Sequence, residues 1–134
     1  MRRFVALVAL AFAATGAVSQ ASATSAAASK TLKVVLVGQS HHPKLHHVWS
    51  YSVTVTDAAT GKPVAVRIDM QFWFAGSKVG EVGVHNVKNG IWKETFKKES
   101  FPAVSVGQPL VLRAFVTAPG YAKGVANWKV AVVK

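Results

Sequence analysis

The sequence predicts an all-β protein, an antiparallel sandwich of about seven short strands. Three observations support this prediction. Apolar and polar residues alternate with a period of two through most of the chain after residue 30. Clusters of Gly, Pro, Asn and Asp interrupt the alternation at short intervals, as turns between strands do. No window after residue 30 keeps a helical period beyond two turns. A small closed barrel is the alternative architecture.

The first two strands are expected at residues 31–37 and 48–56. Residues 31–37 are rich in β-branched side chains, which suit a pleated, half-buried surface. Residues 48–56 alternate cleanly between apolar side chains and Ser or Thr. Its expected inward residues are Trp49, Tyr51, Val53 and Val55.

The longest alternating run, residues 64–74, predicts the third strand. A turn precedes it at residues 57–63, where Asp, Gly and Pro occupy typical turn positions. The apolar residues at alternate positions of this strand face one side of the sheet. Its polar residues face the other side, together with one tryptophan. We expect Ile68 and Phe72 to be buried, and Arg67 and Gln71 to be exposed.

The C-terminal half has weaker patterns. Residues 78–85 predict a strand, and the glycines at 80 and 83 favour a β-bulge within it. Asn89 and Gly90 form a dipeptide that is typical of a hairpin turn. The other expected elements are strands at 91–97, 110–117 and 125–133, a connection at 101–109 and a turn at 118–124. The expected aromatic anchors of the core are Trp49, Trp92 and Trp128.

Residues 1–23 have the pattern of a cleaved secretory signal peptide. Two arginines precede an apolar run over residues 4–18, and the small residues Ala21 and Ala23 mark a signal-peptidase site. The apolar run is shorter than the roughly 20 residues that span a bilayer, which favours cleavage over a retained anchor. We expect a signal peptide at 1–23, a disordered stub at 24–29 and one domain at 30–134, with no transmembrane segment in the mature chain.

The composition excludes several kinds of chemistry. The 134 residues include no cysteine, which removes disulfides, thiol nucleophiles and Cys-ligated zinc. Only 5 residues are Asp or Glu, against 16 Lys and Arg, so paired-carboxylate catalysis has little material. The sequence contains no lipase-type serine motif, zinc-protease motif or phosphate-binding loop. We therefore expect a non-enzymatic protein, and no cofactor is implied.

Two short motifs resemble known families. Residues 53–57 read Val-Thr-Val-Thr-Asp and residues 61–64 read Gly-Lys-Pro-Val, which is similar to the opening hairpin of bacterial extracellular immunoglobulin-like domains. That resemblance covers about residues 51–74 and implies an immunoglobulin-like sandwich without naming a ligand. A looser likeness, from residues 61–64 and the Trp-Lys-Val-Ala-Val of residues 128–132, connects the chain to small exported copper-handling sandwiches. The ligands of those proteins are Met and His.

Four of the five histidines lie within residues 41–47, the segment called the histidine loop below. Imidazole binds late first-row metals such as copper and zinc, so the loop is a candidate metal site. A dedicated site needs a further ligand from the fold, for which Met70 and His85 are the evident candidates. The alternative is a polar, solvated loop or one that responds to pH. The candidate ligands are His41, His42, His46 and His47.

Four basic residues fall at outward positions of the expected strands. The formal net charge is +11, and removal of the two signal-peptide arginines would leave +9. Such a charge favours polyanionic partners, although it also keeps a secreted protein soluble. Trp73 shares the outward parity and is either a contact platform or covered by a neighbouring segment. The candidate ligand-binding residues are Trp73, Arg67, Arg113, Lys93 and Lys129.

The function that these observations favour is an exported, non-enzymatic immunoglobulin-like domain with a binding or structural role at the bacterial surface or envelope. The alternatives are a small exported metal-handling protein that uses the histidine loop and a binder of envelope polyanions that uses a basic face. Expected partners are anionic envelope polymers or another protein. The signal peptide disfavours intracellular nucleic acid as a partner.

We predict that the mature protein begins at Thr24, because the small residues Ala21 and Ala23 flank Ser22 directly after the apolar run. Intact-mass measurement of the secreted protein tests this directly. A protein that retains Met1 and stays with the membrane fraction would contradict the prediction.

Overall fold

The computed structural model describes residues 29–134, so the predicted signal peptide and most of the predicted stub lie outside the described residues. The described chain is all-β, with seven strands in two antiparallel sheets and one short 3-10 turn at Ala103–Ser105. None of its helical segments is long and apolar enough to cross a bilayer. The strands are β1 (Leu32–Gly38), β2 (Trp49–Asp57), β3 (Val66–Phe74), β4 (Ser77–Val87), β5 (Ile91–Phe96), β6 (Leu110–Thr117) and β7 (Gly124–Val130).

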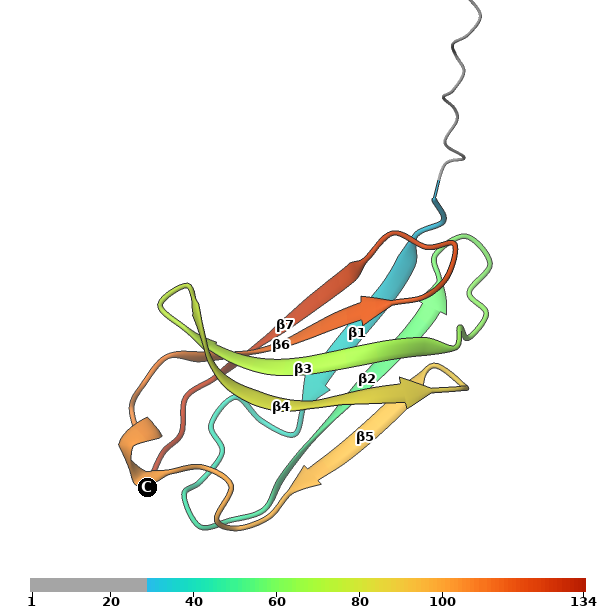
Figure 1. Ribbon diagram of the computed structural model, residues 1–134. Helices are drawn as coiled ribbons and strands as arrows, with labels where there is room; N and C mark the ends of the chain where they lie inside the picture. Colours follow the sequence, from blue (N-terminus) through green and yellow to red (C-terminus); the bar gives the residue numbers. More distant parts are fainter. Residues whose placement is uncertain (1–28) are drawn as a thin grey trace, which may run out of the picture.

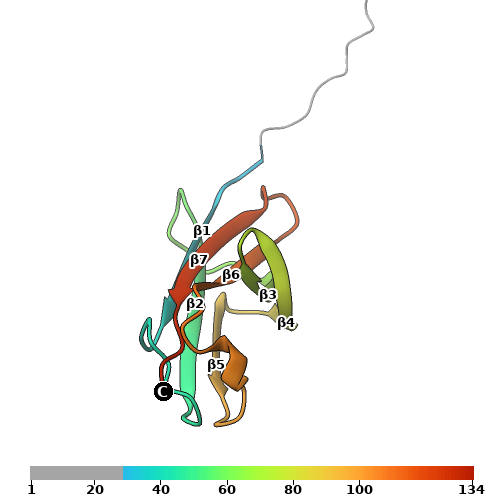
Figure 2. The same cartoon turned by 90° about the vertical axis from the view of Figure 1, so that its left-hand side faces the viewer.

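The strand order is that of an immunoglobulin-like sandwich. One sheet has the order β1-β2-β5, and the other has the order β4-β3-β6-β7. In immunoglobulin terms these are strands A-B-E facing strands C′-C-F-G. The predicted fold class is therefore confirmed, and the closed-barrel alternative is wrong for the described residues because their strands form two separate sheets (Figures 1 and 2).

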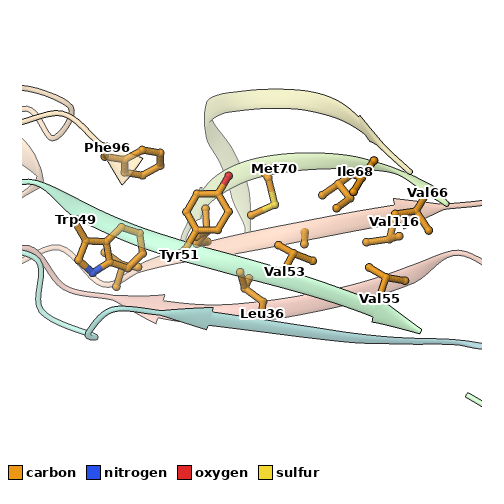
Figure 3. Close-up of a cluster of buried hydrophobic side chains, with 14 of the residues drawn as sticks. Leu36, Trp49, Tyr51, Val53, Val55, Val66, Ile68, Met70, Phe96 and Val116 are labelled. Atoms are coloured by element: carbon orange, nitrogen blue, oxygen red, sulfur yellow. The ribbon is translucent and has the colours of Figure 1, made fainter. Parts of the chain in front are cut away.

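The core lies between β2 of one sheet and β3 and β6 of the other. The predicted inward residues of β2 are all buried, and Figure 3 shows them facing the inward side chains of β3. Ile68 is fully buried and Arg67 is exposed, as expected. Phe72 and Gln71 depart from the expectation, because both are partly exposed. Phe72 packs against Phe96 of the other sheet but borders a groove at the side of the sandwich, and Gln71 hydrogen-bonds to the neighbouring side chains of Asp69 and Trp73.

The predicted hairpin at Asn89 and Gly90 is wrong. Strand β4 pairs with β3, whereas β5 pairs with β2 in the other sheet, so this turn carries the chain between sheets. Gly90 has φ 74° and its carbonyl accepts a 2.7 Å hydrogen bond from the amide of Val55. A side chain at position 90 would meet the backbone of Val55 and Val64. The glycine therefore lets the connection between β4 and β5 pass close to the backbone at these two residues.

The two sides of the sandwich differ. On one side β1 packs against β7, as both views show, and Gly38 and Gly124 leave room for Trp128 and Val34 of the facing strand. On the other side β4 and β5 run apart from their connection at residues 88–90 (Figure 1). The predicted bulge in β4 is confirmed, since its register against β3 shifts twice, at Met70/Gln71 and at Phe72/Trp73.

One side-chain contact fastens the turn after β2 to the loop before β7. The Tyr121 hydroxyl donates a 2.6 Å hydrogen bond to Asp57, whose other oxygen accepts bonds from the amides of Ala59 and Thr60. These bonds, that of Tyr121 first, hold the pKa of Asp57 below its ordinary value. Asp57 therefore stabilises the fold above its unfolded-state pKa, and this contribution is lost as the pH falls through the folded-state value.

We predict that Tyr121→Phe lowers the thermal midpoint at pH 7 by a few degrees, because it removes the donor to the Asp57 carboxylate. The difference from the wild type should shrink as the pH falls from the unfolded-state pKa of Asp57 through its lowered folded-state pKa, because the carboxyl group then protonates. Thermal unfolding followed by circular dichroism across this pH range is the measurement. A difference that is unchanged at low pH would contradict the role of the ionised carboxylate.

Candidate functional site

The outer surface of the four-stranded sheet gathers most of the candidate ligand-binding residues. The strand β3 pairs with β6 in an unbroken register, and β6 pairs with β7, so outward positions align across three strands. We call this surface the Trp73 face. Its residues are Arg67, Asp69, Gln71 and Trp73 of β3, Val111, Arg113, Phe115 and Thr117 of β6, and Val125, Asn127 and Lys129 of β7.

Trp73 is neither a free platform nor fully covered. Its ring is half-buried, and the Arg113 guanidinium lies over it at 4.5 Å from the ring centroid. The indole Nε1–H donates to the Gln71 side-chain oxygen at 2.9 Å. Asn127 in turn accepts a 2.7 Å hydrogen bond from Nε of Arg113. Both the ring and the guanidinium are thus held in place before any ligand arrives.

Asp69 completes this network from the same strand. The Gln71 amide donates to Asp69 Oδ2 at 3.0 Å, and Asp69 Oδ1 is buried without a hydrogen-bond partner among residues 29–134. The carboxylate is therefore tied into the sheet surface and forms no ion pair with Arg67 or Arg113 in the described chain. The two arginines therefore keep their charge available to a ligand.

The other basic candidates separate into two groups. Arg67 and Lys129 lie on the Trp73 face, on strands β3 and β7. Lys93 does not, because it belongs to β5 and pairs with Ser52 in the other sheet. Among the lysines and arginines that the structure describes, only Lys78 lies within salt-bridge distance of a carboxylate, 2.9 Å from Glu81.

The histidine loop holds its four rings against different partners. His41 stacks on Trp128 with 4.0 Å between centroids, and its Nδ1 lies 2.8 Å from the Lys129 carbonyl. His46 has φ 63°, and its Nδ1 is 3.2 Å from Glu99. His47 turns back to the Leu45 carbonyl, and His42 is exposed. In residues 29–134 no three His, Asp or Glu side chains form a group that could hold a metal ion, so metal binding by this loop stays a prediction.

A groove at the open side of the sandwich escaped prediction. It lies between β4 and β5, has a volume of about 800 Å³, and is lined largely by phenylalanine and valine. Its residues come from four distant stretches of sequence, so no local motif signals it. The two register shifts of β4 place extra residues at its rim, which glycines 80 and 83 could have suggested.

A polar cluster lies beside this groove. The Tyr51 hydroxyl donates a 2.6 Å hydrogen bond to Glu94 Oε1 and accepts one from the Trp92 ring nitrogen at 3.3 Å. Burial, followed by the bond to Glu94, raises the pKa of Tyr51 far above its ordinary value, so the hydroxyl stays protonated. His85 stacks on Trp92 at 3.8 Å, and its Nε2 lies 3.8 Å from Glu94 Oε1.

Comparison with solved structures finds similar folds. A domain of the outer membrane lipoprotein Omp28 from Porphyromonas gingivalis is 14% identical over 80% of this chain and 100% of its own, with a TM-score of 0.48. A CARDB domain from Pyrococcus furiosus, solved in complex with di-metal ions, is 13% identical over 81% and 98%, with a TM-score of 0.49. The sporulation control protein Spo0M from Bacillus subtilis is 10% identical over 77% of this chain and 49% of its own, with a TM-score of 0.49.

No protein-family model and no curated protein matches the chain. At identities of 10% to 14% the structural likeness concerns the fold alone.

We predict that Arg113→Ala raises the acrylamide quenching of tryptophan fluorescence, because it uncovers the Trp73 ring. The same substitution in a Trp73→Phe background should leave the quenching unchanged, since the other three tryptophans keep their surroundings. Stern–Volmer titration of the four proteins is the measurement. An equal increase in both backgrounds would show that Arg113 acts elsewhere.

Proposed function

We propose that this chain is an exported, non-catalytic binding domain that holds acidic polysaccharides of the cell envelope against the Trp73 face. The observation that carries the proposal is that Arg67, Arg113 and Lys129 share one sheet surface with a half-exposed tryptophan, whose ring Arg113 covers. Export and the absence of catalysis rest on the sequence, through the signal-peptide pattern and the lack of known catalytic motifs.

The spacing of the charges favours a polymer over a single small anion. Arg67 and Trp73 are six positions apart on β3, which corresponds to roughly 20 Å along the strand. Arg113 lies between them, opposite Gln71, and Lys129 lies in the row of Trp73. One small anion cannot contact basic groups that are spread over such a length, whereas successive units of a charged polymer can.

The chemistry of the face favours an acidic sugar polymer. The guanidinium of Arg113 is a planar, permanently charged donor. Its Nε donates a hydrogen bond to Asn127, so the two terminal nitrogens of Arg113 remain available for a carboxylate or sulfate. The indole of Trp73 offers an apolar surface with a polar edge, which suits ligands that are neither wholly charged nor wholly apolar. Phe115 extends this surface, and Lys123 lies 5.9 Å from its ring centroid.

The test compares two triple variants that lose the same charge. Arg67→Gln/Arg113→Gln/Lys129→Gln removes the bases of the Trp73 face, and Lys33→Gln/Lys62→Gln/Lys93→Gln removes three bases elsewhere. We expect the first variant to bind dextran sulfate about tenfold more weakly than the wild type and with a flatter salt dependence. The second should bind nearly as the wild type does.

Uncharged dextran of equal length is the ligand control, because it keeps the sugar units but lacks the charge. Isothermal titration calorimetry at two salt concentrations gives the affinities. Equal losses in the two triple variants would mean that binding follows net charge only, and the proposed face would be wrong.

A further inference from the structure

The groove between β4 and β5, called the β4–β5 groove below, is a second place where the chain could hold a ligand. It opens at the side of the sandwich, whereas the Trp73 face covers the outer surface of β3, β6 and β7. Its volume of about 800 Å³ falls within the range of sites for small organic ligands. Its apolar lining includes Phe72, Phe74, Phe96, Phe101, Val104 and Leu110.

The inner wall of the groove is a rigid aromatic cluster. Phe72, Phe96 and Phe101 lie with their ring centroids 5.7 to 6.1 Å apart, and Phe96 and Phe101 also contact the fully buried Trp49. The rim is formed by side chains that remain in water, since Val79 is 55% and Val104 is 79% exposed. A preformed apolar wall lets a ligand bind without first ordering the site.

The charge of the groove is opposite to that of the protein. Glu81 and Glu94 are two of only five acidic residues in the chain, and both line it. No lysine or arginine is among the lining residues, although the chain has 16 of them. Lys78 pairs with Glu81 at 2.9 Å, whereas no lysine or arginine of residues 29–134 pairs with Glu94, whose Oε1 lies 3.8 Å from His85 Nε2.

Glu94 is held in position by the polar cluster beside the groove. The bond from Tyr51 and the approach of His85 both involve Oε1, and Oε2 has no hydrogen-bond partner within the described chain. Its side chain is 28% exposed, so the carboxylate is accessible but less screened than a surface group. One fixed anionic oxygen beside phenylalanine rings is suited to an ammonium group, which benefits from both the charge and the ring faces.

We infer that the β4–β5 groove binds a small organic cation, a molecule with an apolar body and one ammonium group. The body would lie against the phenylalanine cluster, and the ammonium group would pair with Glu94. A fatty acid of the same size fits the apolar wall equally well, but its carboxylate would meet Glu94 and Glu81. Charge complementarity therefore selects the cation.

Three probes of matched size test this inference: 6-phenylhexylamine, 6-phenylhexanol and 6-phenylhexanoate. Calorimetric titration at pH 8, above the usual histidine range, should give the order amine, alcohol, acid from tightest to weakest. The net charge of +11 would produce the reverse order if the probes bound non-specifically. Tightest binding of the acid, or no binding of any probe, would overturn the inference.

Variants locate the site. Glu94→Gln keeps an acceptor for Tyr51 and should weaken amine binding by about fivefold while sparing the alcohol. Glu99→Gln is the matched control, because this exposed glutamate pairs with His46 outside the groove. Val104→Ser should weaken the binding of all three probes. Because Val104 is exposed, the substitution should leave the stability of the fold nearly unchanged. Equal effects of the two glutamate variants would overturn the assignment to Glu94.

The Arg67→Gln/Arg113→Gln/Lys129→Gln variant separates this inference from the proposed polysaccharide site. It should bind the amine as the wild type does, since none of the three residues lines the groove. Loss of amine binding in this variant would place the probe on the Trp73 face and refute the groove as its site.

Discussion

The packing of β2 against β3 and β6 across the two sheets holds this molecule together, and every other feature depends on it. The chain has no cysteine, so no disulfide joins the sheets. Their attachment instead rests on fully buried side chains such as Val53, Ile68 and Leu112, each of which contributes about 1.5–3 kcal/mol by burial. Because strand residues alternate, burying one parity fixes the other on the surface. The Trp73 face is therefore a direct consequence of the core.

The sandwich is closed on one side and open on the other, and glycine explains much of the difference. At the β1–β7 side, Gly38 leaves space for Trp128 and Trp49, so the edges meet and His41 can stack over Trp128. At the β4–β5 side the register shifts leave extra residues in the first half of β4, and the two strands run apart from their connection at residues 88–90. Phe72 and Phe74 stay partly exposed there, whereas Phe96 and Phe101 are buried, and together they form the aromatic wall of the groove.

The sequence predicts what depends on local alternation and fails where distant segments meet. The bounds of β6 are predicted as they occur, and the inward parity of β2 is confirmed, because one buried face determines each pattern. Asn89 and Gly90 form a turn, but which strands it joins depends on pairing with β2 and β3, which no local signal reveals. The alternation of each strand predicts that Arg113 and Trp73 both point outward. Their stacking depends also on the register between β3 and β6, which the alternation does not determine. The contact of Glu99 with His46 and the groove were not predicted, because each brings together residues that lie far apart in the sequence.

A basic face and an acidic groove can coexist on one small domain because electrostatic influence is local. The Debye length at physiological ionic strength is about 8 Å, so exposed charges on the Trp73 face are largely screened from a ligand beyond that distance. Glu94 is partly shielded from solvent by Tyr51, Trp92 and His85, which lowers the local dielectric and strengthens its interaction with a nearby charge. The few acidic residues therefore matter more than their number suggests. Asp57 stabilises a turn, Asp69 orders Gln71, and Glu94 gives the groove a sign opposite to that of the protein around it.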